Sequence, residues 1–99
     1  MTINKTQEGN KTIVAVEGWL DVETTAELEN YLEDMGAVEA LVLDFEKLEY
    51  ISSAGVRTVI AAYRRQKEAN ASLELVKVNN DVMDVFSMTG IDKKISISQ

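Results

Sequence analysis

The sequence contains no cysteine, no histidine and no proline among its 99 residues. Without histidine and cysteine it lacks the commonest general base, the commonest metal ligand and the usual partner of a nucleophilic serine. We therefore exclude Ser-His-Asp and Cys-His catalysis, zinc fingers and the ordinary kinds of structural zinc site. We expect no metal and no cofactor, and the lack of cysteine is consistent with a reducing compartment.

Long apolar runs are also missing. The N-terminus has no apolar segment of the kind that a signal peptide needs, and no stretch approaches the roughly 18 apolar residues of a membrane span. We therefore expect an unexported, cytoplasmic chain that does not insert into a membrane. The length predicts one domain that covers residues 1–99.

The charge is acidic overall but unevenly distributed. Seventeen acidic and ten basic residues give a net charge of −7, which opposes binding to nucleic acid. Residues 1–50 hold twelve acidic and three basic residues, a net charge of −9, whereas residues 51–99 hold five and seven, a net charge of +2. The sign changes at the segment 50–55. This asymmetry has two open interpretations, which are solvated faces and a charged surface for a partner.

Apolar periodicity and turn signals predict the secondary structure. We expect strands over 2–6 and 11–17, followed by a helix that starts with a capping box at Thr24 and Glu27 and ends at Gly36. A strand over 40–45 and a helix from about Ser53 come next. A strand over 73–78, a short helix that is capped at Asn79 and closed by Gly90, and a last strand over 95–97 complete the order. The order ββαβαβαβ predicts an α/β fold with three helices. Its mixed, mostly parallel sheet has about five strands, with the N-terminal hairpin as an antiparallel edge.

One segment stands out chemically, because Ser52 and Ser53 lie where a buried strand leads into a basic-ended helix. Functional groups of open α/β sheets collect at the carboxyl ends of the strands, and the N–H groups at a helix N-terminus stabilise negative charge. Ordinary N-capping explains a single serine there. Gly55 in the first helical turn costs up to about 1 kcal/mol relative to alanine, which indicates a close approach to the backbone.

Two chemical roles for these serines fail on the sequence. A nucleophile elbow needs glycine two residues before the serine, where this chain has Ile51. A phosphate-binding loop needs a glycine-rich spacing and a Gly-Lys-Ser/Thr ending, which are absent. The remaining role is modification, since a phosphate would add about 1.5 to 2 negative charges and three acceptor oxygens. Its disruptive effect would fall on a bound partner.

Three segments in order resemble the STAS domain family, specifically the bacterial anti-sigma factor antagonists, over nearly the whole chain. Residues 17–21 (Glu-Gly-Trp-Leu-Asp) look like the family's Gly-Glu-Leu-Asp element. Residues 50–56 (Tyr-Ile-Ser-Ser-Ala-Gly-Val) are similar to its Asp-Ser-Ser-Gly phosphorylation motif, and residues 86–91 (Phe-Ser-Met-Thr-Gly-Ile) to its Phe-x-x-x-Gly-Leu segment.

The resemblance implies a compact STAS domain that is a binding module and not an enzyme. In the family, the unphosphorylated protein binds an anti-sigma factor that is itself a serine kinase, and so releases a sigma factor. The kinase phosphorylates the antagonist with ATP, and a PP2C-type phosphatase reverses this partner switching, which regulates transcription in stress response or sporulation. The implied phosphoacceptor is Ser53, with Ser52 as second choice and Asp21 nearby. The expected partner-binding residues are Asp21, Glu23, Ser52, Ala54, Gly55 and Arg57, of which Glu23 and Arg57 follow from the change of charge around the serines and not from the resemblance.

Other functions remain open at this point. The same fold could be a non-switching STAS scaffold, as a subunit of a transporter or of a signalling assembly. A small enzyme or phosphorelay receiver would use Asp21 and Asp44, but the sequence lacks the adjacent acidic pair and the late lysine that a receiver needs. We expect Asp44 instead to cap the turn after its strand. Trp19 is expected in the core more than at an interface, because the chain has only six aromatic residues.

Overall fold

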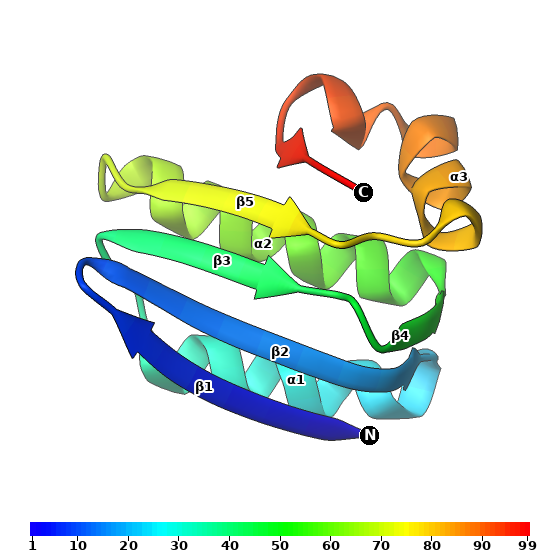
Figure 1. The fold of residues 1–99 in the computed structure, drawn as a ribbon, viewed down its shortest axis with the longest axis horizontal. Coiled ribbons are helices and arrows are strands. Elements are labelled where there is room, and N and C mark those ends of the chain that lie inside the picture. Colours follow the sequence, from blue (N-terminus) through cyan, green and yellow to red (C-terminus); the bar gives the residue numbers. More distant parts are fainter.

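The longest strand, β2 (Lys11–Leu20), organises the sheet, because it pairs with three other strands. In the computed structural model, which describes residues 1–99, β1 (Thr2–Glu8) runs antiparallel to it. β3 (Ala40–Asp44) runs parallel to its first half, and β4 (Leu48–Ile51) runs parallel to its second half. Strand β2 thus joins β3, in the body of the sheet, to β4, which leads into the helix that begins at Ser53 (Figure 1).

The sheet continues on the other side of β3 with two more parallel strands. β5 (Ser72–Val76) pairs with β3, and the short β6 (Ser96–Ile97) pairs with β5, which gives the order β1-β2-β3-β5-β6. The helices are α1 (Val22–Met35), α2 (Ser53–Glu68) and α3 (Asn80–Thr89), followed by the 3-10 helix η1 (Ile91–Lys93). The predicted α/β class, its element order and its antiparallel edge hairpin are confirmed.

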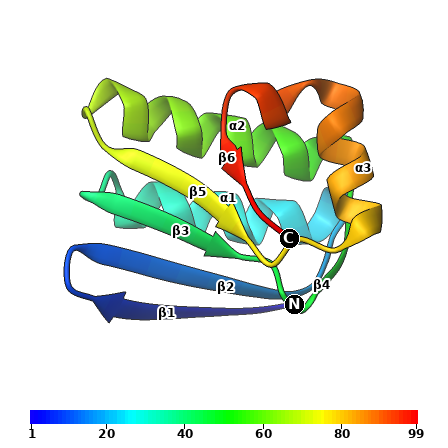
Figure 2. The same cartoon turned by 45° about the horizontal axis from the view of Figure 1, so that its top comes forward.

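Helices α1 and α2 lie against the same face of the sheet, as Figures 1 and 2 show from two directions. The strands alternate as a half-covered sheet requires, because Val14, Leu43 and Leu75 are opposite one another and fully buried. Their neighbours on the other face, such as Ala15 and Val76, are only partly buried. The core therefore lies in one layer between the sheet and the helices.

Several elements differ from the sequence prediction, and β2 reaches Leu20, three residues beyond the predicted end at residue 17. The N-cap of α1 is Asp21, three residues before the predicted Thr24, and Thr24 is the third residue of the helix. The residues between the predicted strand over 40–45 and Ser52, for which the sequence analysis predicts no strand, contain β4, so the sheet has six strands. The last strand is only two residues long, since η1 occupies the residues before it.

A buried glutamine fixes the far end of α2. Gln66 is 1% exposed, accepts a hydrogen bond from the Val38 N–H at 2.8 Å and donates to the carbonyls of Val38 and Ser72, each at 2.8 Å. It thereby ties α2 to the loop that precedes β3 and to the first residue of β5. None of the helices combines the length and the apolar character that crossing a bilayer requires.

Candidate functional site

Two helix N-termini lie side by side at one edge of the sheet. Leu20 at the end of β2 is paired with Ile51 at the end of β4, and the Ser52 N–H donates to the Leu20 carbonyl at 2.8 Å. The next residue on one strand is Asp21, the N-cap of α1, and on the other it is Ser52, the N-cap of α2. Strand pairing therefore brings the predicted aspartate and the predicted serines to the same edge.

The two serines have different environments. The Ser52 hydroxyl oxygen accepts a hydrogen bond from the Gly55 N–H at 3.3 Å, so this side chain caps α2 and is only partly exposed. Ser53 is the first residue of the helix and is exposed, and its hydroxyl takes no part in the cap. The first turn of α2 contains no acidic side chain. No carboxylate of α2 therefore neutralises the positive end of the helix dipole, which lies beside the exposed Ser53 hydroxyl.

Gly55 explains how α2 is brought so close to the strand ends. A Cβ atom at this position would lie 2.6 Å from Ile51 Cγ1 and 3.0 Å from Leu20 Cβ, distances that are too short for a side chain. The close approach to the backbone that the sequence predicts is therefore made by the protein's own strands. Gly55 is buried and positions Ser53, whereas Ala54 is partly exposed beside it.

Asp21 closes a capping box at the start of α1. Its Oδ1 accepts hydrogen bonds from the N–H groups of Thr24 at 2.8 Å and Glu23 at 2.9 Å, and the Thr24 hydroxyl accepts from the Asp21 N–H at 3.0 Å. The Thr24 N–H is the main cause that lowers the pKa of Asp21 below its ordinary value, against a smaller opposing effect of desolvation. Asp21 is thus a charged cap, and Glu23 in the first turn is exposed.

Trp19 and Tyr50 form an exposed aromatic pair next to these caps. They are directly opposite each other on β2 and β4, and they are 52% and 54% exposed. The expectation that Trp19 belongs to the core is wrong. The buried residues Val16 and Leu20 have the opposite phase on β2, so the two-residue period of a strand turns Trp19 to the uncovered face.

Sequence reasoning missed Tyr50 as a surface residue, because β4 is only four residues long. The two-residue period is also broken there, since Leu48 and Ile51 are buried whereas Glu49 and Tyr50 are exposed, and the pairing with β2 shifts register between Leu48 and Tyr50. Two acidic residues accompany the aromatic pair. Glu17 precedes Trp19 by two residues and shares its face of β2, and Glu49 adjoins Tyr50.

Arg57 lies in a shallow groove between the two helices. The groove has a volume of about 310 Å³, and Val22 from α1 and Ala54 from α2 line it with Arg57. Glu29 of α1 lines the same groove, whereas Glu23 does not. The predicted partner-binding residues thus surround the α1 and α2 N-termini, with an acidic side at α1 and a basic residue on α2.

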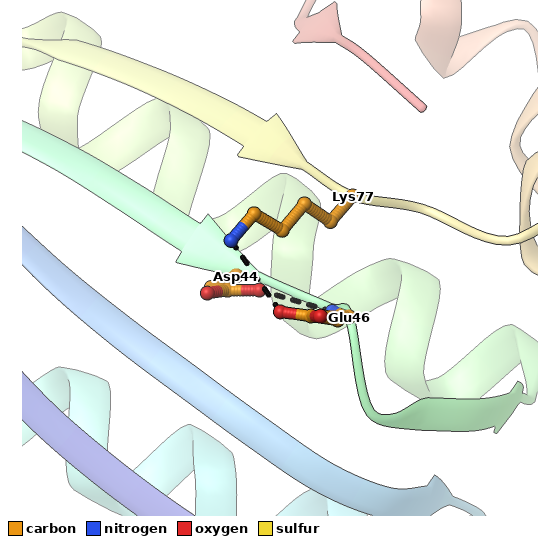
Figure 3. Close-up of polar contacts among 3 residues, drawn as sticks. All are labelled: Asp44, Glu46 and Lys77. Carbon is orange, nitrogen blue, oxygen red and sulfur yellow. Dashed lines mark hydrogen bonds and ion pairs between the residues drawn. The ribbon is translucent and has the colours of Figure 1, made fainter.

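Asp44 lies apart from this site and caps a turn. Its Oδ1 accepts a hydrogen bond from the Glu46 N–H at 3.0 Å, and Glu46 Oε2 lies 3.4 Å from Lys77 Nζ (Figure 3). The turn-capping role that the sequence predicts is confirmed. Asp44 is opposite Ala15, and Asp21 follows six residues later, about 20 Å further along the strand direction. No three acidic residues of the structure are grouped so that they could hold a metal ion.

Known proteins resemble this chain in sequence and in fold. "Putative anti-sigma factor antagonist BtrV" from Bordetella bronchiseptica is 36% identical over 50 residues, which are 50% of this chain and 43% of BtrV. The match thus spans less than half of that relative. An anti-sigma factor antagonist from Mycobacterium paratuberculosis superimposes with a TM-score of 0.89 at 22% identity, over 98% of this chain and 84% of that one.

SpoIIAA, an anti-sigma factor antagonist described as a Bacillus cell fate determinant, also has this fold. Its unphosphorylated form matches with a TM-score of 0.83 at 19% identity, over 99% of this chain and 89% of SpoIIAA. Its phosphorylated form matches with a TM-score of 0.75 at 18% identity, over 99% and 92% of the two chains. The family model described as "Mlab, STAS domain" matches residues 3–97. This chain therefore belongs to the STAS domain family.

Proposed function

We propose that this protein is an anti-sigma factor antagonist that is switched by phosphorylation of Ser53. In its unphosphorylated form it binds an anti-sigma factor with serine kinase activity, and a sigma factor is released. The observation that carries the proposal is the exposed Ser53 hydroxyl at the start of α2, next to a serine that already serves as the cap. Membership of the STAS family and the names of BtrV and SpoIIAA support it.

The local electrostatics explain how one phosphate could act on a partner without unfolding the domain. A phosphate on Ser53 would face the N-terminus of α2, which has no acidic residue in its first turn, so the helix dipole stabilises the added charge. The same charge would come next to Asp21 and Glu23 on the neighbouring helix. A partner that docks on this acidic edge would then meet a changed potential, which alters both association rate and specificity.

The aromatic pair supplies the apolar part of the proposed partner surface. Half-exposed tryptophan and tyrosine side chains are the residue types that dominate binding energy at protein interfaces. Their exposure at the strand ends beside Asp21 and Ser52 puts this apolar area next to the proposed switch. The proposed cycle also needs a PP2C-type phosphatase, takes place in the cytoplasm and requires no catalytic group from this chain.

Phosphate transfer tests the proposal directly. The protein is incubated with ATP and a serine kinase encoded beside it, and the modified residue is located by mass spectrometry. We expect one phosphate on Ser53 in the natural chain and in Ser52→Ala, and none in Ser53→Ala. Stable, stoichiometric binding to another protein without any phosphate transfer would instead favour the scaffold function. Phosphate on Ser52 would move the switch to the capping serine.

Affinity measurements test the aromatic pair. Trp19→Ala or Tyr50→Ala should weaken binding to the kinase by about 2 kcal/mol, or roughly thirtyfold, as removal of an interface hot spot does. Met88→Ala is the matched control, since Met88 is an 83% exposed apolar side chain on α3. Equal affinities for the two aromatic variants and the control would remove the pair from the partner surface.

A further inference from the structure

Four basic side chains from two distant parts of the sequence line one pocket. Arg64 and Lys67 come from the second half of α2, and Lys93 and Lys94 come from η1 and the residue after it. The pocket has a volume of about 550 Å³ and contains no acidic residue in its lining. Figure 2 shows the C-terminal segment that carries η1 beside α2. In a chain of net charge −7, this is a local concentration of positive charge.

No carboxylate of the protein forms an ion pair with these cations. The two ion pairs of the structure, Lys11 with Glu74 and Lys77 with Glu46, involve other residues. Asp92 adjoins Lys93 but is directed to Ser87, with 3.5 Å between Oδ2 and the hydroxyl. Favourable interaction with the helix dipole accounts for Lys67 in the last turn of α2, but it does not account for the two lysines of η1.

Four apolar side chains, one of them aromatic, line the pocket together with these cations. Ile91 and Ile95 are buried, Ile60 and Tyr63 are partly buried, and all four line the pocket. Lys67 Nζ lies 5.8 Å from the centre of the Tyr63 ring. A concave pocket that combines apolar side chains with converging charged groups is the usual form of a small-molecule site, whereas a membrane surface calls for an apolar face that projects outward.

We propose that this pocket binds a soluble molecule that carries at least two phosphate groups. Phosphate suits the residue types, because the Arg64 guanidinium donates paired hydrogen bonds to its oxygens and the lysines act as point charges. Tyr63 and the isoleucines offer contact area to the remainder of the ligand. The pocket is separate from the switch, since Arg64 follows Ser53 by eleven residues, or about 16 Å along α2. It does not depend on the proposed phosphorylation.

Titration of the isolated chain with inorganic tripolyphosphate tests the site. In nitrogen-15 NMR spectra we expect saturable shifts at Arg64, Lys67 and the two η1 lysines, and none at Lys5. The double variant Lys93→Glu/Lys94→Glu should bind at least about tenfold more weakly by calorimetry, because two of the four phosphate-binding charges are reversed. Lys5→Glu/Lys47→Glu changes the net charge equally at exposed lysines outside the pocket and should stay within about twofold.

Several results would overturn the site. One is the absence of saturable chemical-shift changes in the natural chain. Another is an equal loss of tripolyphosphate affinity in both double variants, which would mean that net charge alone causes the binding. Equal affinity for polyglutamate would replace the phosphate ligand with an acidic polypeptide. Binding to phosphatidylglycerol vesicles but not to tripolyphosphate would make the pocket a lipid-headgroup contact. Arg64→Gln/Lys67→Gln, on a different element, should repeat the loss and guards against local misfolding of η1.

Discussion

The two ends of helix α2 are held in place by different means. At the C-terminal end, the buried Gln66 side chain makes three hydrogen bonds, two to Val38 in the loop before β3 and one to Ser72 at the start of β5. At the N-terminal end, the Ser52 cap makes one hydrogen bond of 3.3 Å, and Gly55 lets the backbone pack directly on Ile51. One end is thus fixed by a buried polar network and the other by close backbone packing.

This difference separates stability from function within one helix. Buried hydrogen-bonding groups are costly to leave unpaired, so the Gln66 side chain stabilises the fold, and its burial keeps it out of contact with any partner. The Ser53 end has an exposed hydroxyl, an N-terminus without its own acidic residue and an aromatic pair at the adjacent strand ends. We therefore expect substitution of the buried Gln66 to change stability most, and substitution of the exposed Ser53 to change mainly binding or modification.

The largest expected effect is at the buried glutamine. Gln66→Leu removes the partners of the Val38 N–H and of two carbonyls, and should lower the free energy of unfolding by about 3 kcal/mol. Urea denaturation measures this change. Gln99→Leu, at an exposed glutamine, is the control and should stay within about 0.5 kcal/mol. If both variants unfold at the same urea concentration, the hydrogen bonds of Gln66 do not hold the C-terminal end of α2 in place.

The next effect is at Gly55, where two physical terms have opposite signs. Helix propensity alone would make Gly55→Ala stabilising by about 1 kcal/mol. Because the new Cβ would lie 2.6 Å from Ile51 Cγ1, we expect a net loss of about 2 kcal/mol instead. Thermal unfolding gives the sign of the change. A raised midpoint would show that the strand ends yield easily and that the packing is not tight.

The two serines should differ by a smaller amount. Ser52→Ala removes the N-cap and should cost about 1 kcal/mol in unfolding free energy. Ser53→Ala removes an exposed hydroxyl that takes no part in the cap and should cost less than about 0.5 kcal/mol. Chemical denaturation of both variants measures the difference. A larger loss of unfolding free energy in Ser53→Ala than in Ser52→Ala would mean that Ser53 is the capping residue, and the roles assigned to the two serines would be exchanged.

The smallest effect concerns acid stability at the neighbouring helix. Hydrogen bonds, led by that from the Thr24 N–H, lower the pKa of Asp21 in the folded protein. Its contribution to stability is therefore complete above its ordinary pKa and is lost as the pH falls through the lowered value. Asp21→Asn keeps a capping side chain but does not titrate, so stability should depend less steeply on pH below about pH 4. An unchanged slope would contradict the role of Asp21 as a charged cap.

The sequence predicts most of the fold, because its apolar periods and caps act locally. The cap of α3 is an example, since Asn79 Oδ1 accepts from the Val82 N–H at 2.8 Å as the residue pattern predicts. The same side chain donates to the Leu48 carbonyl at 2.8 Å, which fixes the N-terminus of α3 to β4. That second contact joins segments 31 residues apart, and no local pattern indicates it.

The errors occur where two local signals compete or where strand pairing brings distant residues together. Thr24 and Glu27 match a capping box, but the end of β2 places Asp21 where its carboxylate reaches the first free N–H groups. Trp19 was expected in the core from the scarcity of aromatic residues, although its phase on β2 directs it outward. The side-by-side arrangement of Asp21 and Ser52 follows from β4, a strand too short for its pattern to be recognised.

The most direct test of the proposed switch is the affinity for the anti-sigma kinase before and after stoichiometric phosphorylation of Ser53. We expect the unphosphorylated protein to bind and displace the sigma factor, and the phosphorylated protein to bind at least about tenfold more weakly because of the added charge. Phosphorylation should leave the fold intact, which circular dichroism verifies. Equal affinities of the two forms for the kinase would contradict the account.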